Sequence, residues 1–222
     1  LPHLEADLAV LQALQKALRK GDWKVTVAVH LGDAVFSPRI IHVWPGFYDG
    51  TIYGLAVDLG STTIAAHLCD LRSGAVVASS GIMNPQIRFG EDLMSRVSYG
   101  MMNPTGTGEM TKAVREGMNA LFVQIASEAE IDRSLIMDAV FVCNPVMHHL
   151  LLGLDPAPLG QAPFQLAIDE AVEIAASALD LDLACGTRAY VLPCIAGHVG
   201  AKTGSAIRQP SSGKNPRQRL II

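Results

Sequence analysis

The sequence predicts an α/β protein with a mixed sheet, preceded by a small α+β segment. Strand-like alternation of apolar and polar residues fills most of 53–82, and helix-like and strand-like runs then alternate through 91–193. Apolar residues make up 50% of the 222-residue chain and charged residues only 17%. This composition favours one or two packed domains over disorder.

The first 48 residues predict a small unit of one helix and two strands. Leucines recur at a helical spacing through Leu4–Lys20, and this run ends in basic residues and Gly21. Trp23–Leu31 and Ala34–Trp44 predict two strands separated by a Gly-Asp turn. Pro-Gly and Asp-Gly pairs within 45–50 indicate a boundary. We expect residues 1–48 to be the remnant of a preceding middle or linker domain, because so short a segment buries little core.

The stretch Tyr53–Asp70 predicts a β-hairpin with a tight turn at Gly60. Every second position along both arms is apolar, at Leu55, Val57, Ile64, Ala66 and Leu68. That period is typical of strands with one buried face. A second turn at 72–74 and a third strand at 75–82 complete three antiparallel strands in succession.

Helices and strands alternate after the third strand, which predicts parallel additions to the same sheet. The expected helices are Glu91–Tyr99, Gly108–Glu130, Val146–Leu152, Leu166–Leu179 and a Gly-rich start at His198–Ile207, and the expected strands are Asp138–Cys143 and Arg188–Pro193. We assign residues 49–210 to one lobe. Residues 211–222 are expected to be a linker and the start of a truncated second lobe.

Charge and cysteine content exclude several classes of function. A net charge of −4 gives no electrostatic grip on nucleic acid or on an anionic membrane, and no apolar run approaches the length of a membrane span. The four cysteines are scattered without a C-x-x-C pair, and Cys69 and Cys143 lie in apolar strands. We therefore expect reduced, buried thiols, no iron–sulfur ligation by this chain and a cytoplasmic location.

The hairpin turn is the candidate binding site. Gly60 lets backbone N–H groups approach an anion, and Ser61, Thr62 and Thr63 add hydroxyl donors. The carboxylate of Asp58 would repel a bare phosphate unless a divalent cation lay between them. The pattern predicts a metal–nucleotide site, and the alternative is an ordinary hairpin with a polar, solvated turn.

Two further segments contain candidate residues. Asn144 follows a predicted strand and opens a predicted helix, where its amide can cap the helix or hold a nucleophilic water. His148 and His149 are adjacent, so they point about 100° apart on a helix and are poorly placed to chelate one metal. We expect one to be packed and the other solvated. Gly197 and Gly200 would let a helix N-terminus approach its neighbour or an anion.

Four quoted motifs resemble known families. DLGSTT at 58–63 is similar to the first phosphate motif of the actin, sugar-kinase and Hsp70 ATPase superfamily. NPQIRFGED at 84–92, CNPVMHHLLLGLDPAPLGQAPF at 143–164 and LPCIAGHVGA at 192–201 resemble the ASKHA domain of reductive activators of corrinoid proteins. The resemblance covers about residues 50–208. It implies a ribonuclease-H-like first lobe, and it suggests that residues 1–45 match the domain between ferredoxin and ATPase.

The resemblance implies that the protein uses ATP and Mg²⁺ to return a Co(II) corrinoid protein to Co(I). The [2Fe–2S] cluster would belong to a separate upstream ferredoxin domain. Asp58 would position the metal, the turn would touch phosphate, and Arg88, Glu91 and Asp92 would lie near the cleft. The chain departs from the family pattern at Cys143, where glycine is usual, and at Lys202, where an acid is usual.

Several alternatives stay open at this point. Lys202 would either weaken ATP turnover by reversing a charge or pair directly with phosphate. A small-molecule kinase of the same superfamily and a non-catalytic nucleotide-sensing scaffold are the alternative functions. The corrinoid partner's identity and a homodimeric state are also left open.

Overall fold

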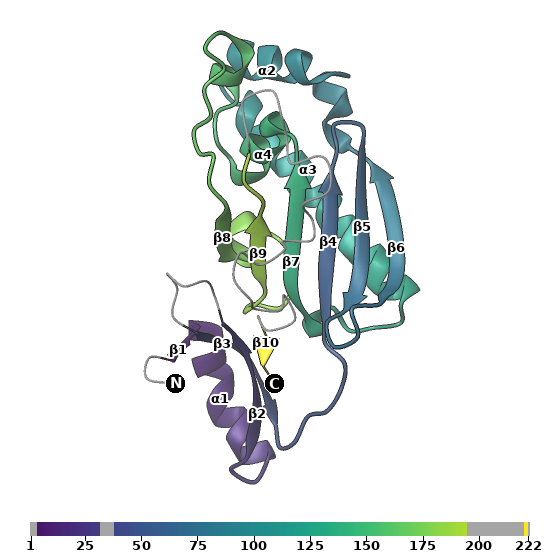
Figure 1. Cartoon of the computed structure of the whole chain (residues 1–222), viewed down its shortest axis with the longest axis vertical. Coiled ribbons are helices and arrows are strands. Elements are labelled where there is room, and N and C mark those ends of the chain that lie inside the picture. The colour runs from purple at the N-terminus through teal and green to yellow at the C-terminus, as the bar shows by residue number, and fades with distance from the viewer. Residues whose placement is uncertain (1–3, 32–37, 195–219, 222) are drawn as a thin grey trace, which may run out of the picture.

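The computed structural model describes residues 4–31, 38–194 and 220–221. It contains a four-stranded sheet in the order β1-β3-β2-β10 and a six-stranded sheet in the order β6-β5-β4-β7-β9-β8. Figure 1 shows the smaller sheet with its helix below the larger one. The mixed α/β class predicted from the sequence is confirmed, while the predicted domain limits stay predictions.

The small sheet carries one helix, α1 (Leu8–Lys20). Its strands are β1 (Glu5–Ala6), β2 (Val25–His30), β3 (Arg39–Pro45) and β10 (Leu220–Ile221). Val10 and Ala17 of α1 are buried against Val43 of β3. Only part of the predicted leucine stripe faces this cluster, because Leu14 packs against it while Leu8 and Leu11 are 70% and 54% exposed. Leu4 also lies outside the helix, since the chain around it is extended and pairs at Glu5 with Arg39.

The large sheet begins as the predicted antiparallel hairpin. Strands β4 (Tyr53–Leu59), β5 (Thr63–Asp70) and β6 (Val76–Met83) pair in succession. Strand β7 (Ile136–Cys143) pairs parallel to β4, and β9 (Arg188–Val191) pairs parallel to β7. Strand β8 (Val172–Ala175) closes the other edge in the antiparallel direction. The prediction of parallel additions is therefore confirmed for β7 and β9.

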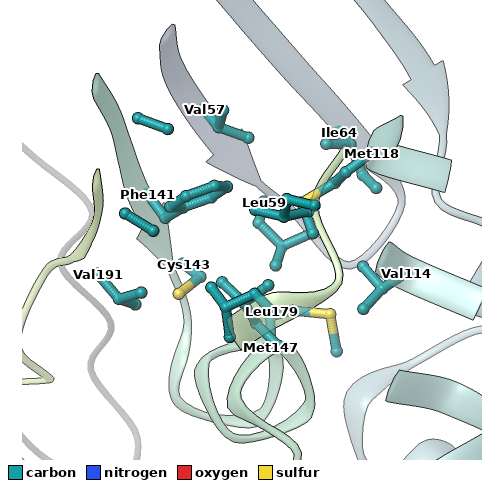
Figure 2. Close-up of a cluster of buried hydrophobic side chains, with 14 of the residues drawn as sticks. Val57, Leu59, Ile64, Val114, Met118, Phe141, Cys143, Met147, Leu179 and Val191 are labelled. Carbon is teal, nitrogen blue, oxygen red and sulfur yellow. The ribbon is translucent and has the colours of Figure 1, made fainter. Parts of the chain in front are cut away.

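Helices cover the core face of the large sheet. They are α2 (Leu93–Met102), α3 (Gly106–Glu128) and α4 (Pro145–Leu152), with a 3₁₀ turn η1 (Pro85–Phe89) before α2. Helix α3 lies behind the sheet in Figure 1 and packs on β5 and β6. Its side chains interdigitate with the core-facing residues of β4 and β7, and Figure 2 shows Leu59, Met118 and Phe141 in this cluster.

The predicted helix at Leu166–Leu179 is wrong. Val172 and Ile174 instead belong to the edge strand β8, which pairs with β9, and only a 3₁₀ turn η4 (Ala176–Leu179) follows. The segment is rich in alanine and glutamate, which favour helix locally, but the exposed edge of β9 offers it a hydrogen-bonding partner. Tertiary pairing overrides the local preference here.

The two sheets meet at a buried apolar contact. Ala28, Ile41 and Trp44 of the small sheet pack against Ile52, which directly precedes β4, and against Met137 of β7. The backbone at Gly186 lies so close to Ile41 of β3 that a Cβ atom on residue 186 would lie 1.7 Å from the Ile41 carbonyl oxygen.

A buried polar cluster also joins the two sheets, from His30 of β2 to Glu173 of β8 and Arg188 of β9. His30 Nδ1 is 3.4 Å from Glu173 Oε1, and Arg188 Nε is 3.9 Å from the same oxygen.

The cysteines are free thiols, as predicted. Cys143 is buried but Cys69 is only half-buried. Burial raises the pKa of the Cys143 thiol, with smaller contributions from Cys194 and Asp58. Among the described residues, no helix combines the length and apolar character needed to cross a bilayer.

Candidate functional site

The turn between β4 and β5 is closed by one backbone hydrogen bond, from the Gly60 N–H to the Thr63 carbonyl at 3.0 Å. A Cβ atom on Gly60 would lie 2.6 Å from that same carbonyl oxygen. No side chain fits there without moving backbone, so glycine is required by close approach. The predicted Gly-bearing turn is confirmed as a structural feature.

Three successive carbonyls of this turn accept hydrogen bonds from inside the protein. The Gly60 oxygen accepts from Asn84 Nδ2 at 2.8 Å, the Ser61 oxygen from Arg96 Nη2 at 2.6 Å, and the Thr62 oxygen from the Asn84 N–H at 2.8 Å. The C=O and N–H of a trans peptide point in opposite directions. The N–H groups of Ser61 and Thr62 are therefore directed away from this interior, and neither has a backbone or side-chain acceptor among the described residues.

A buried polar cluster stands behind the turn. Asn84, Gln86 and Arg96 are each 0% exposed. Arg96 Nη1 lies 3.4 Å from both Gln86 Oε1 and Met147 Sδ, and Arg96 Nε donates to the Gly90 carbonyl at 2.9 Å. Burial lowers the pKa of Arg96, and the charge of Asp92 partly offsets this. A guanidinium stays protonated at neutral pH in proteins, so a fixed positive charge lies directly behind the turn.

Asp58 lies two residues before Gly60 on β4. Its neighbours Val57 and Leu59 face the core, and Asp58 is exposed on the opposite face of the strand. It is paired in register with Ala65 of β5 and Val142 of β7. Its carboxylate is thus open to solvent at the carboxyl end of β4.

Asn144 lies at the same edge of the sheet. Leu59 and Cys143 are register partners at the carboxyl ends of the parallel strands β4 and β7, so Asn144 follows next to Gly60. Its Oδ1 accepts from the Met147 N–H at 3.0 Å and caps helix α4. The capping role predicted for Asn144 is confirmed, and its side-chain NH₂ donates to nothing among the described residues.

The two histidines of α4 are both buried, so the expectation that one is solvated is wrong. His149 Nδ1 lies 2.8 Å from the Pro145 carbonyl, and its Nε2 accepts from the Ala167 N–H at 3.0 Å. Within the described part of the chain, neither ring nitrogen of His148 has a hydrogen-bond partner. Burial, and secondarily His149, lowers the pKa of His148 to about 4. The described residues contain no group of three or more histidine, cysteine or acidic side chains able to hold a metal.

The structure shows no hydrogen bond from Arg88 or Asp92 to the turn among the residues that it describes. Arg88 is exposed and stacks over the neighbouring Phe89 ring, with 4.7 Å from its Cζ atom to the centroid. Asp92 caps α2 by accepting from the Ser95 N–H at 2.8 Å. Gly197, Gly200 and Lys202 fall outside the described residues, as does the predicted helix start at His198–Ile207.

Sequence reasoning missed the cluster behind the turn. Asn84 and Gln86 lie at the start of the motif at 84–92, before a predicted helix, and the sequence predicts no role for either side chain. Arg96 had a usable signal, because it lies three residues after Leu93 and next to Val97 on the apolar side of α2. A cation at a position that the helical period assigns to the core indicates a buried polar network.

Comparison with known proteins gives concordant matches. The RACo linker region matches residues 2–50 and the RACo middle region matches residues 53–210. The corrinoid activation enzyme RamQ of Eubacterium limosum is 31% identical over 173 residues, which cover 77% of this chain and 28% of that protein.

A solved structure, titled reductive activator for corrinoid, iron-sulfur protein, superposes with a TM-score of 0.79 at 31% identity. The match covers 89% of this chain and 31% of the solved chain. The chain thus spans less than a third of the length of each of these two relatives.

Proposed function

Because the chain belongs to the RACo family, we propose that it is the ATP-binding portion of a reductive activator of corrinoid proteins. The two relatives are described as a corrinoid activation enzyme and a reductive activator. The proposal carries that activity to this chain as one part of a larger machine.

Strand order supports a ribonuclease-H-like first lobe of the ASKHA type. Strands β6, β5 and β4 form an antiparallel meander, and β7 and β9 extend it in parallel to β4. This is the arrangement that the sequence resemblance implies. In such α/β sheets, ligands collect at the carboxyl ends of parallel strands, which here is the edge with Asp58, Gly60 and Asn144.

The observation that carries the proposal is the outward-facing backbone of the turn. The interior cluster occupies the carbonyls of Gly60, Ser61 and Thr62, so the N–H groups of Ser61 and Thr62 remain for a ligand. Convergent N–H groups with nearby hydroxyls bind phosphate oxygens. The cation of Arg96 behind the turn favours a ligand with several negative charges.

Asp58 and Asn144 supply the remaining functions of the proposed site. One exposed carboxylate suits Mg²⁺, which is usually held by one or two carboxylates, waters and the substrate's own phosphates. When bound, Mg²⁺ neutralises charge that develops on the phosphates. Asp58 would hold the metal, the turn would hold the phosphate chain, and the NH₂ group of Asn144 would hold the attacking water.

The role of the nucleotide is to favour one shape of the protein over another. A shape that binds two states of the corrinoid protein unequally can shift their equilibrium, and ATP hydrolysis resets it. One electron from a reduced [2Fe–2S] domain would convert Co(II) to Co(I), while ATP and water give ADP and phosphate. This chain contributes the nucleotide site and not the electron donor.

The test is to mix the protein that carries this chain with ATP, Mg²⁺, a reduced iron–sulfur donor and an oxidised corrinoid protein. Optical absorption then measures the conversion of Co(II) to Co(I) over time. Reduction that depends on ATP supports the proposal. Phosphate appearing on a small molecule would instead indicate a kinase, and binding without turnover a sensing scaffold.

A further inference from the structure

Arg96 is an expensive residue to bury. It is 0% exposed, and each atom that its guanidinium contacts is neutral: the carbonyls of Gly90 and Ser61, Gln86 Oε1 and Met147 Sδ. Buried cations normally pair with a carboxylate, and a well-packed apolar side chain in their place is often at least as stable. Stability alone therefore gives no reason for an arginine here.

The contact with the turn is the shortest of the set. Arg96 Nη2 donates to the Ser61 carbonyl at 2.6 Å, and a hydrogen bond from a charged donor is about twice as strong as a neutral one. It fixes the Ser61–Thr62 peptide plane and polarises it. The Thr62 N–H on the far side of that plane becomes a better donor, because hydrogen bonds in a chain strengthen one another.

The same cluster reaches the other side of the proposed site. Met147 Sδ accepts from both Arg96 Nη1 at 3.4 Å and Asn84 Nδ2 at 3.6 Å. The N–H of Met147 is the group that Asn144 caps. One buried network thus links the phosphate turn to the residue proposed to hold the water.

We propose that Arg96 is the positioning residue of the phosphate turn, which is the turn Gly60–Thr63. Its buried charge makes this turn selective for a polyphosphate chain, although Arg96 itself does not contact the phosphates. This inference rests on the proposed function, because it assigns a role within the same site. It adds that the phosphate chain, and not the nucleoside, is what this part of the site recognises.

The test uses the 222-residue chain and the magnesium complex of inorganic tripolyphosphate, with binding measured by calorimetry. Arg96→Met removes the charge but keeps a side chain of similar length. Arg96→Lys keeps the charge but loses the planar guanidinium that donates several hydrogen bonds at once. Arg115→Lys is the matched control, since Arg115 also donates to a backbone carbonyl, that of Leu151 at 2.9 Å, but has no contact with the turn.

We expect Arg96→Met to weaken binding at least about tenfold, the size of one charged hydrogen bond. We expect Arg96→Lys to lose less and Arg115→Lys to bind like the wild type. The loss of affinity on adding salt should be shallower for Arg96→Met than for the wild type and Arg96→Lys, because the removed charge no longer contributes a screened attraction. A residue that only supports the fold would leave that salt slope unchanged.

The outcomes separate the two proposals. If the wild type binds neither Mg·ATP nor the tripolyphosphate complex, the proposed function fails. If the wild type binds and Arg96→Met binds as well, or both Arg96 variants lose equally, the role of Arg96 is refuted.

Should no Arg96 variant fold, NMR of the wild-type guanidinium N–H signals decides. A shift of the Arg96 signals on saturation with the tripolyphosphate complex supports the inference, and unchanged signals overturn it.

Discussion

Gly60 is the position where one added methyl group tests the geometry of the turn. In Gly60→Ala the new Cβ would lie 2.6 Å from the Thr63 carbonyl oxygen, against 3.4 Å at the start of ordinary contact. The carbonyl must retreat by about 0.8 Å, because the opposing atoms are backbone and no rotamer relieves the overlap. That movement lengthens the Gly60 to Thr63 hydrogen bond from 3.0 Å to beyond bonding range.

Three contributions set the change in the free energy of unfolding for Gly60→Ala. Losing one backbone hydrogen bond costs about 1 kcal/mol, and overpacking at a rigid site costs about 1–3 kcal/mol. Alanine restricts the unfolded chain and returns about 0.4–1 kcal/mol. We therefore expect Gly60→Ala to lower the free energy of unfolding by about 1–3.5 kcal/mol and to weaken Mg·ATP binding at least about tenfold.

Urea unfolding followed by circular dichroism measures the first quantity and calorimetry the second. Gly108→Ala is the matched control, because no atom lies within 4 Å of its added Cβ and the residue lies in helix α3. It should stabilise the protein by about 0.5–1 kcal/mol. Equal stability and equal Mg·ATP affinity in Gly60→Ala and the wild type would refute the reasoning about the turn.

Three further changes test other parts of the structure. Burial depresses the pKa of His148 from 6.5 to about 4, so its neutral form stabilises the fold above pH 6.5 and this stability is lost as the pH falls toward 4. His148→Leu should therefore reduce the difference in the free energy of unfolding between pH 5 and pH 7, measured by urea titration. An unchanged difference would contradict this reasoning. Asn144→Ala should lower the free energy of unfolding by about 1 kcal/mol because the helix cap is lost, whereas Asn144→Ser should keep the cap. ATP turnover should fall in both variants. Normal turnover in Asn144→Ser would show that the amide takes no part in the chemistry. Gly186→Ala puts a Cβ 1.7 Å from the Ile41 carbonyl oxygen and should lower the unfolding free energy by about 3 kcal/mol or more; a stable variant would show that the two sheets are not held this closely.

Local patterns were enough to predict the centre of the large sheet. The period-2 alternation of Leu55 and Val57 placed β4 because one face of that strand is buried against α3. Long-range pairing was beyond such patterns. The segment 172–175 is a strand only because β9 lies beside it, and Leu8 and Leu11 match a helical period without being the face that packs on β3.

The candidate site was predictable where chemistry lies close in sequence. Asp58, Gly60 and the three hydroxyls lie within the six consecutive residues 58–63, and Asn144 marks its own strand-to-helix junction. Arg96 is 35 residues from the carbonyl it holds, and Met147 is 51 residues from Arg96. These contacts depend on how the helices cover the sheet, which no local pattern contains.

The central claim is that a carboxylate beside a glycine turn holds a nucleotide through its cation. Calorimetry of ATP binding to the wild type and to Asp58→Ala, with and without Mg²⁺, tests it most directly. We expect the wild type to bind ATP more tightly with Mg²⁺, and Asp58→Ala to lose at least about tenfold in affinity together with that metal dependence. Equal affinities for the two proteins in the presence of Mg²⁺ would contradict it.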